Sequence, residues 1–278
     1  MNARAYSTMT PGKWVLAGEH TVLRGGSAIA LPHPQFRLSL EFLPSGASLR
    51  VEPDLATPVV HELLRIGKDW LASRGVPFEV PRGTLAITST IPFGAGLGSS
   101  AALSVAMARW VLFSASLDPK LERELAREME NRFHGTSSGM DVAAVSMAEP
   151  IYFSMAKGAV PLKVDRLPEF VFFDSGLRNS TRDCIGKVAA LRARDPARGE
   201  VLDGEMKRAT EEIFAGLRTP DEADIERGMK RAGEVFSAWG LVPDEVKAIL
   251  EKLEREGVRS PRLTGAGGGG FIVGLKSN

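Results

Sequence analysis

The sequence is poor in cysteine and in net charge, and each shortage excludes a class of protein. Cys184 is the only cysteine among 278 residues, so neither an internal disulfide nor a paired-cysteine metal site can form. A chain without disulfides suits a reducing compartment, and we expect a cytoplasmic location. Lys and Arg number 35 against 34 Asp and Glu, a formal charge of +1, which provides no overall field to hold nucleic acid.

Long hydrophobic runs are also missing. The most apolar stretch, residues 101–117, is shorter than a membrane span and contains Arg109. Residues 1–13 contain no apolar core of a signal peptide. Hydrophobic residues make up 44% of the chain and charged residues 25%, which is ordinary for a folded domain. We therefore expect one large or two moderate globular domains, with neither a membrane nor a nucleic acid as partner.

The hydrophobic periodicity predicts helices and strands without strict alternation, which favours an α+β fold over a doubly wound sheet. Alternating apolar and polar residues predict a strand at residues 36–42, and further strands are expected at 84–90, 169–174 and 270–275. Helices are expected at residues 57–74, 99–114, 119–133, 183–194, 201–217 and 223–238, with another beginning at Pro243. A stretch punctuated by glycine and proline predicts a domain boundary, with domains at residues 1–158 and 159–278.

The strongest local signal is the stretch IPFGAGLGSSAA at residues 91–102, between an expected strand and an expected long helix. Three glycines at every second position allow positive φ angles and a close approach of the backbone to a ligand. The helix start then directs its N–H groups and its dipole toward an anion. Ser99 and Ser100 add hydroxyls that suit either a helix cap or an Mg²⁺ ligand. A plain glycine turn capped by serine is the alternative.

Other phosphate-binding motifs do not fit. A Walker A motif needs Gly-Lys followed by Ser or Thr, and here each Gly-Lys pair precedes Trp14, Asp69 or Val188. A formal GxGxxG occurs at residues 265–270, but it precedes an expected strand instead of a helix, which argues against a Rossmann site. Neither His-Arg-Asp nor Asp-Phe-Gly occurs, which excludes a protein kinase fold.

Three separated motifs resemble the signatures of the GHMP kinases, a family that includes galactokinase, homoserine kinase, mevalonate kinase and phosphomevalonate kinase. They are residues 11–20, the glycine loop at 92–102, and LTGAGGGG at 263–270, in family order. GEHTVLRGGSAIA at residues 18–30 and HGTSSGMD at 134–141 resemble most closely the mevalonate kinase branch. Thr21 stands where that branch has alanine, and Ser137 stands where it has proline, which predicts a looser turn before Asp141.

The resemblance implies a two-domain GHMP kinase fold, with a ribosomal-protein-like N-terminal domain, a ferredoxin-like C-terminal domain and the site between them. It implies ATP-dependent phosphorylation of the primary hydroxyl of (R)-mevalonate, with Mg²⁺ as cofactor, as a step of isoprenoid precursor synthesis. Another small-molecule kinase of the family, or a silent sensor that binds ATP and a metabolite, remains open. A decarboxylase is disfavoured because Lys13 is present. Homodimer formation also remains open.

The resemblance also assigns roles to individual residues. Asp141 is implied as the general base for the attacking hydroxyl, and Lys13 as the cation that keeps it ionised. Glu130 and Ser100 are implied as the Mg²⁺ ligands. The residues expected to bind ATP are Lys13, Ser89, Gly94, Ala95, Gly96, Leu97, Gly98, Ser99 and Ser100; those expected on the substrate side are Glu19, His20, Ser138 and Thr181.

Without the motifs, the same residue types suit ordinary structural roles. Asp141 would be a turn residue, and Glu130 would belong to a solvated helix face. Residues 265–270 are expected to form a supporting loop, and Cys184 is expected to be an inert helix residue. A solvated helix face is also expected for the basic residues Arg182, Lys187, Arg192, Arg194 and Arg198, although Arg182 or Lys187 near the substrate is an alternative.

Overall fold

The computed structural model describes residues 4–134 and 137–277, and it confirms a fold of mixed helices and strands. Its contacts divide the chain into two compact units. The first comprises Met1–Gly12, Pro32–Pro92 and Gly98–Ala148, and the second comprises Lys13–Leu31, Phe93–Leu97 and Glu149–Asn278. The expected boundary between residues 158 and 159 stays a prediction.

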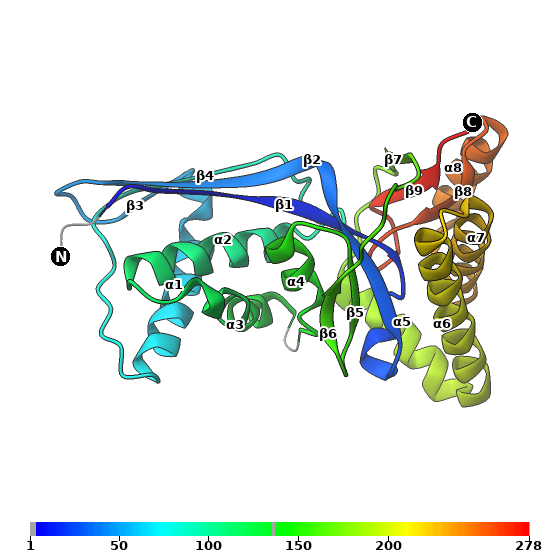
Figure 1. The fold of residues 1–278 in the computed structure, drawn as a ribbon, viewed down its shortest axis with the longest axis horizontal. Helices are drawn as coiled ribbons and strands as arrows, with labels where there is room; N and C mark the ends of the chain where they lie inside the picture. The colour runs from blue at the N-terminus through cyan, green and yellow to red at the C-terminus, as the bar shows by residue number, and fades with distance from the viewer. Residues whose placement is uncertain (1–3, 135–136, 278) are drawn as a thin grey trace. The chain divides into compact units, whose positions relative to one another are not determined.

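In the first unit, helices cover one face of a sheet (Figure 1). Strand β2 (Ser27–Pro44) pairs with β4 (Gly83–Ser89) in antiparallel register from Leu38 opposite Ser89 to Pro44 opposite Gly83, and β3 (Arg50–Glu52) lies parallel to β4. Strand β1 (Tyr6–Ala17) pairs with β2. The helices are α1 (Thr57–Ala72), α2 (Ser99–Ser114), α3 (Glu122–His134) and α4 (Met140–Met147).

Helix α2 forms the centre of this unit because it is apolar on nearly all sides. Trp110 is fully buried, and its ring lies 5.2 Å from that of Phe42 on β2. Arg109 is tolerated in this apolar helix because its guanidinium binds Glu122 at 2.7 Å and donates to the carbonyls of Met9 and Ser146.

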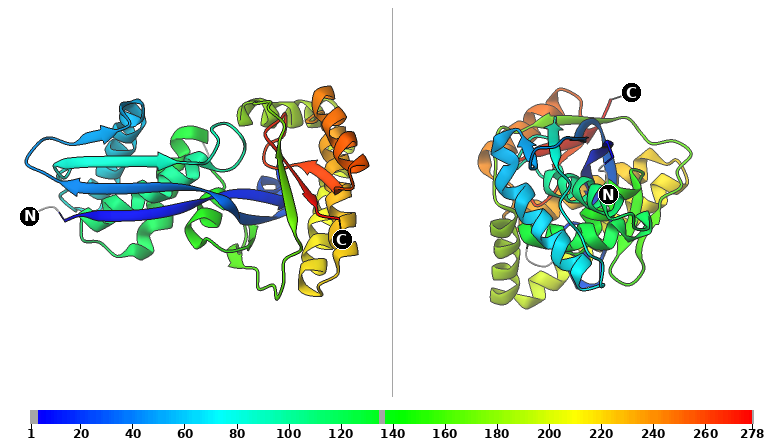
Figure 2. Two further views of the ribbon diagram at one scale, coloured as in Figure 1. Left: turned by 90° about the horizontal axis from the view of Figure 1, so that it is seen from above. Right: turned by 90° about the vertical axis from the view of Figure 1, so that its left-hand side faces the viewer.

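The second unit contains a three-stranded sheet packed with helices. Strand β9 (Phe271–Leu275) lies between β7 (Phe170–Asp174) and β8 (Arg259–Leu263), antiparallel to both. Helices α6 (Pro196–Arg218) and α7 (Glu222–Ala238) form a long antiparallel pair, and α7 and α8 (Asp244–Arg255) pack against β8 (Figures 1 and 2). The unit also contains α5 (Thr181–Arg194) and the strands β5 (Ile151–Ser154) and β6 (Gly158–Pro161), where β5 pairs with the start of β2.

All expected helices are present, and α2 has the expected bounds. The expected strands are also present, but β2 is much longer than the strand predicted at residues 36–42. It begins at Ser27 and continues through Pro32 and Pro34 before the alternating pattern starts. The periodicity missed α4, β3, β5, β6 and β8, which are short or, in β8, rich in arginine and proline. Within residues 4–134 and 137–277, every helix is too short or too polar to cross a bilayer.

Candidate active site

The glycine loop has the backbone conformation that its sequence predicts. The φ angles are 68° at Gly94, 78° at Gly96 and 71° at Gly98, all in the left-handed region that favours glycine. The N-cap of α2 is Gly98, which has no side chain with which to cap the helix, and the Ser100 hydroxyl donates to Glu130 at 2.9 Å. A helix start whose N-cap residue offers no side-chain acceptor suits an anion.

The second glycine-rich loop, residues 264–270, packs directly on the first. A Cβ at Gly270 would lie 2.6 Å from the carbonyl oxygen of Ala95, and one at Gly265 would lie 3.2 Å from that of Gly96. Contacts this short exclude side chains from the interface between the two loops. The loop at 264–270 is thus a support for the first glycine loop, which confirms its expected role.

Lys13 lies against the glycine loop with only 4% of its surface exposed. Its backbone N–H donates to the carbonyl of Leu97 at 2.9 Å, and its Nζ donates to the carbonyl of Gly96 at 3.2 Å. Within the second unit Lys13 therefore contacts the glycine loop, and its role in ATP binding stays a prediction. Its coupling to Asp141, a residue of the first unit, stays a prediction.

Glu130 is fully buried on α3, so the interpretation as a solvated helix face is wrong. Its Oε1 accepts a hydrogen bond from Ser100 at 2.9 Å and its Oε2 accepts one from Ser104 at 3.1 Å. Sequence reasoning missed Ser104, although Ser100 and Ser104 are four residues apart on one helix and therefore share a face. A carboxylate beside a hydroxyl is a set of hard oxygen donors, which fits Mg²⁺.

The donor set is small. Among the described residues no group of three or more His, Cys, Asp or Glu side chains gathers in the way that a metal cage requires. Mg²⁺ is commonly bound by one or two protein carboxylates, with water and substrate phosphates as the remaining ligands. The paired Ser100 and Glu130 therefore fit the predicted ion, and their assignment as its ligands stays a prediction.

Asp141 lies in the first turn of α4, directly after Met140. Gly139 precedes the helix with a φ of 84°. The hydroxyl of Ser138, a predicted substrate-side residue, accepts a hydrogen bond from the N–H of Met140 at 3.3 Å. Gly135 and Thr136 of the same motif lie outside the described residues.

Glu19 forms a buried ion pair with Arg262, at 2.7 Å between Glu19 Oε1 and Arg262 Nη2. Arg262 also donates to the carbonyl of Leu16, and its guanidinium lies 4.8 Å from the ring centroid of Phe236. Burial raises the pKa of Glu19, and the charge of Arg262 opposes that rise. Sequence reasoning missed Arg262, although its place directly before the LTGAGGGG motif was a signal.

His20 is held next to this ion pair with its tautomer defined. Its Nε2 lies 2.9 Å from the carbonyl oxygen of Ala266, and a carbonyl can only accept, so Nε2 carries the proton. Burial lowers the pKa of His20, which favours the neutral ring with Nδ1 as an acceptor. The His20 ring packs against two aromatic rings, with centroid distances of 5.4 Å to Trp239 and 6.0 Å to Phe236.

Two other predicted residues lie at the ends of elements. Thr181 is the first residue of α5 and is exposed. Ser89 ends β4, and its hydroxyl accepts from the N–H of Ile91 at 3.1 Å. Cys184 is buried, and its thiol donates to the carbonyl of Gly267. Burial raises the pKa of this thiol, which disfavours the reactive thiolate and agrees with the expected inert role.

The basic residues of the second unit are mostly exposed, as expected, but Arg192 is not a solvated side chain. It donates to Asp203 at 2.6 Å, and Arg24 binds the same carboxylate with two bonds of 2.7 and 2.8 Å. Asp203 is nearly buried and is therefore able to order both guanidinium groups. The other members of the run, Arg182, Lys187, Arg194 and Arg198, are exposed.

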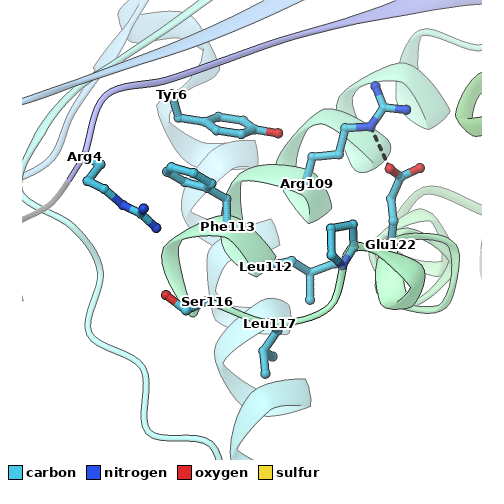
Figure 3. Close-up of a pocket in the computed structure, with 9 residues that line it drawn as sticks. Arg4, Tyr6, Arg109, Leu112, Phe113, Ser116, Leu117 and Glu122 are labelled. Atoms are coloured by element: carbon cyan, nitrogen blue, oxygen red, sulfur yellow. Dashed lines mark hydrogen bonds and ion pairs between the residues drawn. The ribbon is translucent and has the colours of Figure 1, made fainter.

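A cavity of about 280 Å³ lies elsewhere in the first unit, beside β1 and the end of α2 (Figure 3). Its walls include Tyr6, Phe113, Arg109 and Glu122, and none of its lining residues belongs to the predicted site. The Arg4 guanidinium covers the Phe113 ring at 4.8 Å. The ion pair between Arg109 and Glu122 in this lining connects α2 to α3. The cavity therefore lies where these two helices are joined.

Comparison with known proteins agrees with this geometry. The model of the GHMP kinases N terminal domain matches residues 60–149, and the GHMP kinases C terminal model matches residues 213–278. The chain is 31% identical to a mevalonate kinase of Archaeoglobus fulgidus, over 95% of this chain and 90% of that protein. It is 28% identical to a mevalonate kinase of Aeropyrum pernix, over 98% of this chain and 89% of that protein.

Solved structures agree on the fold. The chain superimposes on L. major mevalonate kinase in complex with R-mevalonate with a TM-score of 0.81, covering 98% of this chain and 87% of that one. At 21% identity, this likeness establishes the fold alone.

Proposed function

Because this chain belongs to the GHMP kinase family, we propose that it transfers the γ-phosphoryl group of ATP to the primary hydroxyl of (R)-mevalonate, giving 5-phosphomevalonate and ADP. The similarity to two mevalonate kinases over nearly the whole chain supports this acceptor. One observation carries the proposal: Ser100 donates a hydrogen bond to the buried carboxylate of Glu130. Ser100 lies at the start of α2, directly after the glycine loop, and Glu130 lies on the neighbouring helix α3.

The glycine loop binds the triphosphate of ATP. Its backbone carries no side chains at Gly94, Gly96 and Gly98, so phosphate oxygens approach the N–H groups closely. The start of α2 contributes its dipole, and Lys13 contributes a positive charge beside the loop. Phosphoryl transfer depends mainly on such positioning and charge neutralisation.

Ser100 and Glu130 would hold Mg²⁺, which when bound neutralises charge on the phosphates of ATP. Ser104 has a supporting role, because its hydroxyl donates to the second oxygen of Glu130 and so orients the carboxylate. Loss of such an orienting partner typically weakens metal binding about 10- to 100-fold.

Asp141 accepts the proton of the attacking hydroxyl, and Lys13 is its proposed catalytic partner. On the substrate side, His20 offers Nδ1 as an acceptor because Nε2 is occupied by Ala266. Glu19 keeps this segment in place through Arg262, while Ser138 and Thr181 complete the proposed substrate contacts. A cytoplasmic location and homodimer formation stay predictions.

Release of ADP, measured with four separate acceptors, tests the proposal. The acceptors are mevalonate, phosphomevalonate, homoserine and galactose, each with saturating ATP and Mg²⁺. We expect kcat/KM for mevalonate to exceed the others by about 10⁴–10⁵-fold, a ratio typical of a site built to hydrogen-bond one substrate. If the enzyme phosphorylates another acceptor more efficiently, that acceptor replaces mevalonate as the proposed substrate. If the protein binds ATP but phosphorylates none of the four acceptors, it is a sensor and not a kinase.

Asp141→Asn tests the proposed base directly. The amide keeps the shape of the side chain but cannot accept the proton, so kcat should fall by about 10²–10⁴-fold. ATP affinity, measured by calorimetry, should remain near that of the wild type. A variant that retains more than about a tenth of the wild-type kcat would exclude Asp141 as the base, since a lost base costs at least about 10²-fold.

A further inference from the structure

The backbone of Ser137, four residues before Asp141, is held from two directions by α3. The Oδ1 atom of Asn131 accepts a hydrogen bond from the N–H of Ser137 at 2.9 Å. The guanidinium of Arg127, one helical turn earlier, donates to the carbonyl of Ser137 at 3.1 and 3.3 Å. Both polar groups of one peptide residue are therefore satisfied by side chains of a neighbouring helix.

This restraint is transmitted along a short, hydrogen-bonded turn. The hydroxyl of Ser137 accepts from the N–H of Gly139 at 3.1 Å, and Gly139 is the N-cap of the helix that carries Asp141. A Cβ on Gly139 would meet the Arg127 side chain at 3.4 Å, so the turn lies against α3. Asp141 is in the first turn of α4. The backbone of residues 137–139 leads directly into this helix, so its conformation sets the position of Asp141.

We propose that Asn131 is a positioning residue for Asp141, acting through the N–H of Ser137. The proposal rests on the proposed function, because it takes Asp141 as the base. A proline at residue 137 would stiffen this turn through its ring but would present no N–H group. Serine lacks that stiffness and supplies the donor that Asn131 binds. Asn131 is partly buried whereas Arg127 is exposed, so water competes less for the hydrogen bond that Asn131 makes.

Two substitutions of Asn131 separate the hydrogen bond from the shape of the side chain. Asn131→Leu removes the acceptor and should lower kcat by about 10- to 100-fold, as small misplacements of a reacting group do. The KM for ATP should change less than about threefold, because the glycine loop proposed to bind ATP is untouched. Asn131→Asp keeps an acceptor oxygen and should retain kcat within about threefold of the wild type.

Glu128→Leu is the matched control, since Glu128 is exposed on the same helix. Leucine has a higher helix propensity than asparagine, so a loss of kcat in Asn131→Leu cannot come from a weakened α3. Wild-type kcat in Asn131→Leu, or equal losses in Asn131→Leu and Asn131→Asp, would overturn the proposal.

A double-mutant cycle with Ser137→Pro tests the named contact. Proline at 137 removes the N–H, so Asn131 has nothing to hold there. In that background, adding Asn131→Leu should change kcat by less than about threefold, although it should cost about 10-fold or more in the wild type. Additive losses would show that Asn131 acts through some other contact and would overturn the proposal.

Amide hydrogen exchange distinguishes failure of this proposal from failure of the proposed function. Asn131→Leu should speed the exchange of amides in residues 138–143 in the full chain, while Asn131→Asp and Glu128→Leu should not. This result needs no acceptor, so it holds even if mevalonate is not the substrate. Unchanged exchange in Asn131→Leu would overturn the restraint itself, whatever the enzyme phosphorylates.

Discussion

Glu130 is a charged residue that is fully buried, and two serine hydroxyls at opposite carboxylate oxygens make that burial tolerable. A buried carboxylate without partners would be strongly destabilising. The two serines differ in their proposed roles, because only Ser100 is proposed as a metal ligand. They therefore provide an internal comparison.

Ser100→Ala removes a proposed metal ligand and Glu130→Gln removes the negative charge of the other. Each should raise the Mg²⁺ concentration for half-maximal activity by about 100-fold or more, beyond the roughly 10- to 100-fold that loss of an orienting partner costs. Ser104→Ala removes only an orienting bond, so it should raise the Mg²⁺ requirement by about 10-fold and lower the free energy of unfolding by about 1 kcal/mol. Titration of activity with Mg²⁺ and urea denaturation measure the two effects. Equal Mg²⁺ curves for Ser100→Ala and wild type would remove Ser100 from the metal site.

Gly96→Ala should weaken ATP binding through the close packing of the two glycine-rich loops. The added Cβ would lie 3.4 Å from the carbonyl of Thr264, at a φ of 78°. Gly75→Ala is the control, because it has a φ of 70° with open space around the new methyl group. Both substitutions should cost about 1–2 kcal/mol of stability for the left-handed conformation. Calorimetry should show reduced ATP affinity only in Gly96→Ala, and equal affinities would contradict the loop assignment.

At the scale of elements, β2 runs through Pro32 and Pro34 although proline cannot donate within a sheet. His33 between them is buried and stacks on Phe36 at 4.5 Å. Its Nδ1 accepts from the N–H groups of Gln35 and Phe36 at 3.2 and 3.4 Å. The ring thus satisfies backbone donors at a place where prolines interrupt the strand, and it can do so only while Nδ1 is unprotonated.

The stability of the fold should therefore depend on pH through His33. Burial lowers the pKa of His33 to about 4, whereas the unfolded chain takes up a proton near 6.5. Between these values the unfolded state binds more protons, so stability is full above about pH 6.5 and falls as the pH decreases toward 4. Urea denaturation at about pH 7, 6 and 5 should show a steeper loss for wild type than for His33→Asn. Parallel losses would contradict this role.

At the scale of the whole molecule, β1 and β2 contribute residues to both compact units. Residues 13–31 belong with the C-terminal half of the chain, as their contacts show. The Trp14 ring packs against Phe170 and Phe172, with centroid distances of 4.9 and 5.2 Å. The Thr264 hydroxyl accepts from the N–H of Val15 and donates to its carbonyl. The second unit is therefore assembled from segments far apart in the sequence.

A fragment of residues 159–278, the domain expected from the sequence, should fail to unfold cooperatively on heating. It lacks the buried segment around Trp14 and Leu16, and so it exposes the faces of β7 and β8 that this segment covers. Burying a large apolar side chain contributes about 1.5–3 kcal/mol, a large share of the stability of a small domain. Circular dichroism during heating compares the fragment with the full chain. A sharp transition in the fragment would show that it folds alone.

Much of the molecule is determined by local sequence. The helices follow from apolar spacing, and Asp118 caps the turn before α3 as its Asp-Pro pair predicts. The glycine loop follows from residues that alone tolerate its φ angles. The motifs at residues 11–20, 92–102 and 263–270 indicate the family by themselves, because their chemistry is encoded in adjacent residues.

Other features depend on which distant residues meet, and only the tertiary structure decided them. Nothing local to Arg262 indicates a pairing with Glu19, 243 positions away, and nothing local to Asn131 indicates that it holds Ser137. Periodicity also could not show that Glu130 is buried among the charged residues of α3. A side chain's charge is a local property, whereas its burial and its partners depend on the packing of the whole fold.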